Sequence, residues 1–252
     1  MEKLQNSSSN NTNYGFLNGN VLKIIALVAM TIDHVGVIMF PELEVLRMIG
    51  RIAFPLFAFF VAEGCKYTRN KWRYWGMIFG LGVVFEIFSR IFAHTTECNI
   101  FITFSLSILL IYLLSWAKKT IKEHNAKMIV LSMFAFVFAA AAVYVLVEIL
   151  PSYTQRYTAV DYGFFGVMVA VFVSVFDKHY ARVTMFAIAL VLLCALRSPV
   201  WLTQWFCLLA VPLVAWYNGE RGKLRLKYLF YVYYPAHLLI IYGIAELIKV
   251  VK

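Results

Sequence analysis

Residues 128–147 read MIVLSMFAFVFAAAAVYVLV and include no charged side chain. A run of about 20 apolar residues is long enough to cross the hydrocarbon core of a bilayer as an α-helix. The run is continuous and does not alternate with polar residues, unlike the strands of a transmembrane β-barrel. Because a backbone in lipid must satisfy its own hydrogen bonds, this stretch predicts a membrane-spanning helix.

Similar apolar runs follow one another along the rest of the chain. They predict an all-α fold, a polytopic transmembrane helix bundle of about nine spans, with span ends uncertain by a few residues. The run 183–197 is short and is followed closely by the next one, so this pair is either two spans or a re-entrant element. The predicted spans are 22–40, 46–64, 75–93, 100–116, 128–149, 160–176, 183–197, 200–216 and 229–248.

The composition agrees with a chain surrounded by lipid. Hydrophobic residues make up 62% of the 252 residues and charged residues 14%, and the mean hydropathy is +0.77. Soluble domains have about half apolar and a quarter charged residues, so a soluble globular protein is excluded. Residues 1–20 are rich in Asn and Ser and predict a disordered polar tail, which leaves 21–252 as a single transmembrane domain.

The net charge of +10 comes from the loops between the predicted spans. Every second loop is basic, as cytoplasmic loops are, so we expect a cytoplasmic N-terminus and no nucleic-acid partner. The four cysteines have no metal-ligand spacing and give no argument for a disulfide, and we expect no metal. The basic loops contain Lys66, Arg69, Lys71 and Arg73; Lys118, Lys119, Lys122 and Lys127; Lys178 and Arg182; and Arg221, Lys223, Arg225 and Lys227.

Several ionisable residues lie inside the predicted spans, where they are costly and usually face a bundle interior or a watery cavity. Four separate spans bring such groups to the middle or the outer half of the bilayer. We therefore expect one shared polar chamber that opens toward the outer side. The residues are Asp33, His34, Arg47, Arg51, Glu63, Glu86, Arg90 and His237.

Helical spacing predicts which of these charges pair. Glu86 and Arg90 are four residues apart and can form an ion pair that holds helices together. Arg47 and Arg51 are also four apart and repel each other, so an anion should lie near them. The candidates are Asp33, Glu86 and a bound anion. We expect Asp33 to reach Arg51 or His237, while His34 faces the chamber.

Five segments of the sequence resemble one known family. They cover residues 22–110 and 225–245 and are similar to the TraX family of bacterial membrane proteins, named after a protein needed to acetylate the N-terminus of F-type pilin. The middle of the chain matches only in hydropathy. The segments are LKIIALVAMTIDHVG (22–36), LRMIGRIAFPLFAFFVAEG (46–64), YTRN (67–70), NIFITF (99–104) and KYLFYVYYPAHL (227–238).

The resemblance implies an activity, because TraX proteins are similar to transmembrane acyltransferases such as the lysosomal heparan-glucosamine acetyltransferase. It implies a bacterial inner-membrane enzyme that moves an acyl group, expected to be acetyl, from cytosolic acyl-CoA to an amine or hydroxyl on the outer side. The acceptor stays open among a protein N-terminus, a glycan, a lipid headgroup and a small molecule. The family motif falls on Asp33, His34, Arg51, Glu63 and His237.

On this interpretation His34 is the general base, and Asp33 or another carboxylate holds the imidazole in register; transfer is either direct or through an acyl-histidine. Arg51 stabilises charge on the thioester oxygen, and His237 is a second base or an orienting group. Glu63, Glu86 and Arg90 are structural or supporting. An ion-coupled transporter and a non-catalytic scaffold are the alternatives. The phosphates of acyl-CoA are expected to meet Lys66, Arg69, Lys71, Arg73 and Arg47, with help from Arg221, Lys223 and Arg225.

Overall fold

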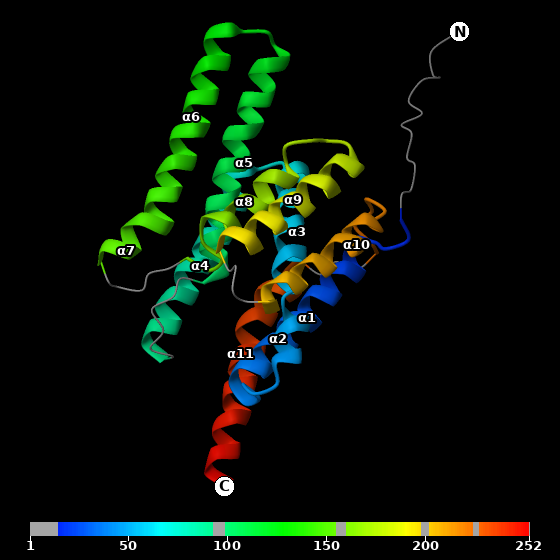
Figure 1. Cartoon of the computed structure of the whole chain (residues 1–252), viewed down its shortest axis with the longest axis vertical. Helices are drawn as coiled ribbons and strands as arrows, with labels where there is room; N and C mark the ends of the chain where they lie inside the picture. The colour runs from blue at the N-terminus through cyan, green and yellow to red at the C-terminus, as the bar shows by residue number, and fades with distance from the viewer. Residues whose placement is uncertain (1–14, 93–98, 155–159, 198–201, 224–226, 252) are drawn as a thin grey trace.

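The computed structural model describes residues 15–92, 99–154, 160–197, 202–223 and 227–251 (Figure 1). Almost all of these residues lie in helices, and strand pairing within the described ranges is limited to an isolated bridge between Leu17 and Tyr217. The predicted all-α helix bundle is therefore confirmed.

The helices follow the order of the predicted apolar runs. A π-helical turn, η1, continues α6, and a 3₁₀-helix, η2, precedes α10. The elements are α1 (Gly19–Met39), α2 (Glu44–Gly50), α3 (Ala53–Tyr67), α4 (Lys71–Phe92), α5 (Ile100–Lys122), α6 (Ala126–Tyr144), η1 (Val145–Ile149), α7 (Leu150–Thr154), α8 (Gly163–Val173), α9 (His179–Arg197), η2 (Leu202–Leu209), α10 (Ala210–Ala215) and α11 (Lys227–Val251).

Several helical segments are long and apolar enough to cross a membrane, which makes this a multi-pass membrane protein. Three further apolar helices are shorter, so fewer than nine of the predicted spans reach full length in the described residues. Residues 183–216 were predicted to form either two spans or a re-entrant element. Their described residues lie in one long helix, α9, and in a shorter helical segment made of η2 and α10. The five long segments are Gly19–Met39, Glu44–Tyr67, Ile100–Lys122, Ala126–Tyr153 and His179–Leu196.

The predicted boundary of the N-terminal tail is too late in the sequence. Asn18 caps α1, because its side chain accepts hydrogen bonds from the backbone N–H groups of Asn20 and Val21, each at 3.1 Å. The Leu17 N–H donates to the Trp216 carbonyl at 3.0 Å, which ties the start of the helix to the end of α10. Ordered structure thus begins before residue 20, and the predicted tail up to residue 14 lies outside the described residues.

The basic loops gather at one end of the bundle, called the basic end below. Lys118 at the end of α5 donates to Asp177, in the turn before α9, at 3.0 Å. This hydrogen bond, with the nearby charges of Lys122 and Lys66, holds the pKa of Asp177 below its usual value. Lysines of two basic loops therefore lie around a carboxylate that belongs to a third. In Figure 1 the turn between α5 and α6 is at the top, and α11 ends at the bottom.

The core lies around α8, a short helix that is apolar on every side. Val167, Val169 and Val171 are almost completely buried against α3, α5 and α9. The neighbouring helix α6 has the opposite character, because Val130, Phe134 and other large apolar side chains on it are exposed. An apolar helix with an exposed apolar surface is expected where the surroundings are lipid.

Candidate functional site

Two histidines from opposite ends of the sequence meet in the structure. His34 on α1 and His237 on α11 lie with His34 Nδ1 and His237 Nε2 3.0 Å apart, and their ring centroids are 4.9 Å apart. His237 is buried, whereas His34 is half-buried. We call this pair the histidine dyad.

The hydrogen-bond partners assign the tautomers of the dyad. His237 Nδ1 lies 2.8 Å from the Tyr233 carbonyl, which can only accept, so in the neutral ring this nitrogen carries the proton. His237 Nε2 must then accept, and His34 Nδ1 is its donor at 3.0 Å. His34 Nε2 is left with a lone pair, which makes it the basic atom of the dyad.

Aromatic residues of α11 hold the dyad in place. The Tyr233 ring stacks on His237, with centroids 5.2 Å apart, and Tyr234 packs edge-on against both histidines. The Thr31 hydroxyl donates to the Leu27 carbonyl at 2.9 Å and lies 2.7 Å from the Tyr233 hydroxyl, which therefore donates to it. These contacts fix α11 against α1 at the level of the histidines.

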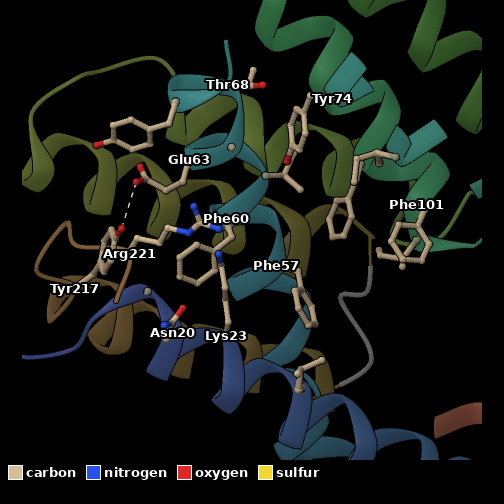
Figure 2. Close-up of a pocket in the computed structure, with 18 of the residues that line it drawn as sticks. Asn20, Lys23, Phe57, Phe60, Glu63, Thr68, Tyr74, Phe101, Tyr217 and Arg221 are labelled. Carbon is tan, nitrogen blue, oxygen red and sulfur yellow. Dashed lines mark hydrogen bonds between the residues drawn. The ribbon is translucent and has the colours of Figure 1, made fainter. Parts of the chain in front are cut away.

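A cavity of about 950 Å³ extends into the bundle from the basic end (Figure 2). Its polar lining lies mainly near the ends of α1 and α3 and in the segment after α10, and much of its remaining wall is aromatic. The Lys23 and Arg221 side chains reach toward each other beside the Phe60 ring in Figure 2. We call Lys23, Arg69 and Arg221 the basic mouth. The aromatic wall includes Phe57, Phe60, Tyr74, Phe101, Phe104 and Tyr234.

The cavity leads from the basic mouth toward the dyad. One face of α1 lines it through Asn20, Lys23, Leu27 and Met30, which follow at helical spacing, and the next residue on that face is His34. His34 lies about 16 Å along the helix from Lys23. Tyr234 both lines the cavity and touches the two histidine rings. The dyad therefore lies just beyond the deep end of the cavity.

Only part of the predicted phosphate-binding loop lines the cavity. Of the loop 66–73, Arg69 lines the cavity, whereas Lys66 lies over the Tyr67 ring and Lys71 over the Tyr112 ring, each nitrogen 5.4 Å from the ring centroid. Arg73 is exposed at the same end. Lys23 is a mouth residue that was not predicted from the sequence, although its spacing to His34 places both residues on one face of α1.

Asp33 belongs to a separate cluster. Its carboxylate pairs with Arg47 on α2 at 3.4 Å, so the expectation that it reaches Arg51 or His237 is wrong. Arg51 instead donates to the Tyr162 hydroxyl at 3.4 Å. Because Asp33 and His34 are successive residues of a helix, they point about 100° apart, one toward α2 and the other toward α11. The single chamber expected from the sequence is two polar clusters on different faces of α1.

This arrangement removes Arg47 from the predicted phosphate-binding set. Arg47 lies on α2 beside Asp33, whereas the basic mouth lies at the start of α1 and the end of α3. The anion beside Arg47 is thus Asp33, one of the three candidates, whereas Arg51 donates to the Tyr162 hydroxyl.

Most of the chain, including both histidines, Asp33 and the cavity wall, also matches a protein family in sequence. The family described as "TraX protein" matches residues 18–245. The chain belongs to the TraX family. A relative is an uncharacterized protein of Rickettsia prowazekii, 40% identical over 106 residues, which are 42% of this chain and 39% of the relative.

A second relative of this TraX-family chain is the probable fimbrial assembly protein FimC, serogroup H1, of Dichelobacter nodosus. It is 37% identical over 71 residues, 27% of this chain and 29% of that protein. The chain thus spans well under half the length of either curated relative in these matches. No solved structure matches the chain.

Glu63, a motif residue of the TraX-family chain, forms a buried ion pair. Its carboxylate contacts Arg182 on α9, and both side chains are less than one-tenth exposed. Tyr217 donates to the same carboxylate at 3.4 Å, and Arg182 donates through Nε to the Val173 carbonyl at 3.3 Å. Arg182 was expected in a solvated basic loop; it is instead buried between helices because Glu63 faces it. This pair ties α3 to α9.

The remaining predicted pair, Glu86 and Arg90, is confirmed. Arg90 Nε donates to Glu86 Oε1 at 2.7 Å along α4. Asn99 donates to the other oxygen of Glu86 at 3.4 Å and to the Gly82 carbonyl at 2.8 Å. The pair therefore links α4 to the start of α5. Within the described residues no group of three or more His, Cys, Asp or Glu side chains is arranged to hold a metal ion.

Substitution of Gly50 by alanine is expected to destabilise the TraX-family protein. A β-carbon at Gly50 would overlap the side chain of Asp33, which must then move away from Arg47. Such overpacking costs about 1–3 kcal/mol. Thermal unfolding in detergent should show a lower midpoint for Gly50→Ala, whereas Gly80→Ala in helix α4, where a β-carbon meets nothing within 4 Å, should unfold at the wild-type midpoint or slightly above it.

Proposed function

We propose that this TraX-family protein is a membrane-embedded acyltransferase. It takes an acyl group, expected to be acetyl, from acyl-CoA that enters at the basic end, and transfers it to an amine or hydroxyl that arrives from the opposite side. The observation that carries the proposal is the cavity that runs from the basic mouth as far as Tyr234, whose ring packs against both histidines of the dyad.

The cavity suits acyl-CoA in charge and in length. Lys23, Arg69 and Arg221 at its mouth match the phosphates, since basic side chains bind phosphate through charge-assisted hydrogen bonds. The aromatic wall suits the uncharged pantetheine arm. The distance of about 16 Å from Lys23 to His34 is close to half of a hydrocarbon core of about 30 Å. An arm anchored at the mouth would therefore present its thioester near the dyad.

The dyad supplies general-base catalysis. His34 Nε2 takes the proton from the acceptor while the acceptor nitrogen or oxygen bonds to the thioester carbonyl carbon. The carbon–sulfur bond then breaks, and the leaving sulfur receives the proton, which gives free CoA and the acylated acceptor. His237 accepts from His34 Nδ1 and so keeps His34 Nε2 directed away from it. His237 is thus a positioning residue in the manner of the third member of a triad.

The orientation in the membrane follows from the charge of the loops. The basic end is proposed to face the cytoplasm of a bacterial cell, with the protein in the inner membrane and the N-terminus inside. Acyl-CoA is then available at the mouth. The acceptor comes from outside, and the name of the fimbrial assembly relative makes the N-terminal amine of a pilin-like protein the first acceptor to test.

The proposal is tested with the purified full-length protein in liposomes. Acetyl-CoA labelled in its acetyl group is added on the basic side, and pilin-like peptides with free or blocked N-termini are added on the other side. Label transferred to the free amine, with release of CoA, supports the acyltransferase. Movement of a solute or ion across the membrane without use of acetyl-CoA would favour the transporter, and neither result would favour a scaffold.

Loss of charge at the basic mouth is expected to weaken acyl-CoA binding. Combined Lys23→Gln and Arg221→Gln removes two positive charges that line the cavity. Each charge-assisted hydrogen bond contributes about 1.5–3 kcal/mol, so the loss of both should raise KM for acetyl-CoA about 100-fold or more, with kcat little changed.

The matched control is Lys127→Gln, because Lys127 is exposed at the same end but away from the cavity. Acetyl-pantetheine, which lacks the nucleotide phosphates, serves as a second control, and its KM should be the same for the wild type and the double variant. An equal loss with both substrates would show that the two cations do not bind phosphate.

A further inference from the structure

Two cysteines outside the proposed catalytic machinery are in direct contact. Cys194 lies in the last turn of α9 and Cys207 lies in η2, and their sulfurs are 3.4 Å apart. Both side chains are completely buried. The Cys194 thiol also lies 3.5 Å from the Gln204 carbonyl, so backbone and sulfur contacts together hold α9 against η2.

We propose that Cys194 and Cys207 are a disulfide-forming pair that locks η2 onto α9. A disulfide has a sulfur–sulfur distance of about 2.05 Å, so the two sulfurs need to approach by little more than 1 Å. Small rotations about the side-chain bonds supply that movement. This pair could not be predicted from the sequence, because a separation of 13 residues matches no cysteine motif.

The chemistry needs an oxidant. Each thiol loses its proton, one S–S bond forms, and two electrons pass to the oxidant. A protein disulfide can accept them by exchange and becomes a dithiol. Because the folded pair is buried, exchange with a protein disulfide would take place before η2 packs against α9, whereas a small membrane-permeant oxidant such as diamide reaches the folded pair through local opening. The pair lies at the end of α9 opposite the basic end, which is where an oxidising compartment would lie if the basic end is cytoplasmic.

The disulfide would restrict movement beside the polar cluster formed by Asp33, Arg47 and Arg51. η2 packs against α2 as well as α9, and α2 carries Arg47, with Arg51 at its end. A covalent bond between η2 and α9 therefore fixes one wall beside the Asp33–Arg47 pair. Cys65 is buried on α3, and Cys98 lies outside the described residues.

The test compares two variants of the full chain that each keep two cysteines. Cys65→Ala with Cys98→Ala keeps the proposed pair, and Cys98→Ala with Cys207→Ala keeps Cys65 and Cys194. Membranes are treated with diamide, which accepts two electrons and two protons, and the denatured protein is then labelled with a polyethylene-glycol maleimide. We expect no label on the first variant before reduction and two labels after it, and two labels on the control variant at both stages.

Two labels on the first variant after diamide treatment would overturn the proposal, as would a disulfide-linked dimer in place of an internal bond. Peptide mapping of the unsubstituted protein, oxidised in the same way, gives a readout that does not depend on the folding of any variant. Linked peptides that contain Cys194 and Cys207 support the pair, and separate peptides contradict it.

Discussion

Replacement of His34 by glutamine should lower kcat for acyl transfer by about 10²–10⁴-fold, the usual contribution of a general base. Glutamine keeps a polar side chain at the contact with His237 but has no basic nitrogen. The effect should fall on kcat, with KM for acetyl-CoA little changed, because His34 lies beyond the deep end of the cavity and not at its mouth. The measurement is steady-state transfer of labelled acetyl groups by purified protein.

Two further variants separate catalysis from folding. His124→Asn changes an exposed histidine at the turn after α5 and should keep full activity. His34→Ala should regain part of its activity when imidazole is added, because the cavity gives a small base a route to the missing ring. Near-full activity of folded His34→Gln, or activity of His237→Gln lower than that of His34→Gln, would contradict the assignment of His34 Nε2 as the base.

The largest expected loss of stability comes from separation of Glu63 and Arg182. Removal of one partner leaves the other charge buried without its counter-ion, which costs about 3–5 kcal/mol. Glu63→Leu and Arg182→Met should each lower the unfolding midpoint in detergent strongly. The double variant should recover most of the loss, because two apolar side chains of similar size can replace a buried ion pair at little cost.

The exposed pair Lys119 and Glu123 provides the matched control. Its nitrogen and oxygen are 3.6 Å apart on the surface of α5, and both side chains are more than half exposed. Lys119→Ala should therefore change stability by less than about 1 kcal/mol. If the double variant of the buried pair is less stable than either single variant, the two side chains contribute through packing with Phe59 and Tyr217 and not mainly through their charges.

Features that depend on local sequence could be predicted. Apolar runs of bilayer length gave the helix class and the order of the helices, because length and hydropathy alone decide whether a segment can lie in lipid. The Glu86–Arg90 pair was predictable since both residues share one helix, where a separation of four residues fixes their proximity. The clustering of the basic loops also followed from their alternation along the chain.

Contacts between distant helices could not be predicted in the same way. Helical geometry predicted that Asp33 and His34 point in different directions, with Asp33 reaching Arg51 or His237 and His34 facing the chamber. Packing instead pairs Asp33 with Arg47 and His34 with His237. The sequence indicated no partner for Glu63. In the structure, Arg182 on α9 forms an ion pair with it. Which side chains pair across two helices depends on how each helix is rotated about its axis and packed. That rotation is set by contacts throughout the core and not by the sequence of one helix.

The sequence by itself determined that this chain is a membrane protein built of helices, because hydropathy and helix length are local properties. Only the tertiary structure decided that residues 203 positions apart form one dyad, that a cavity leads to it from the basic end, and that two cysteines touch. Side-chain contacts over such separations arise from packing, which no single segment encodes.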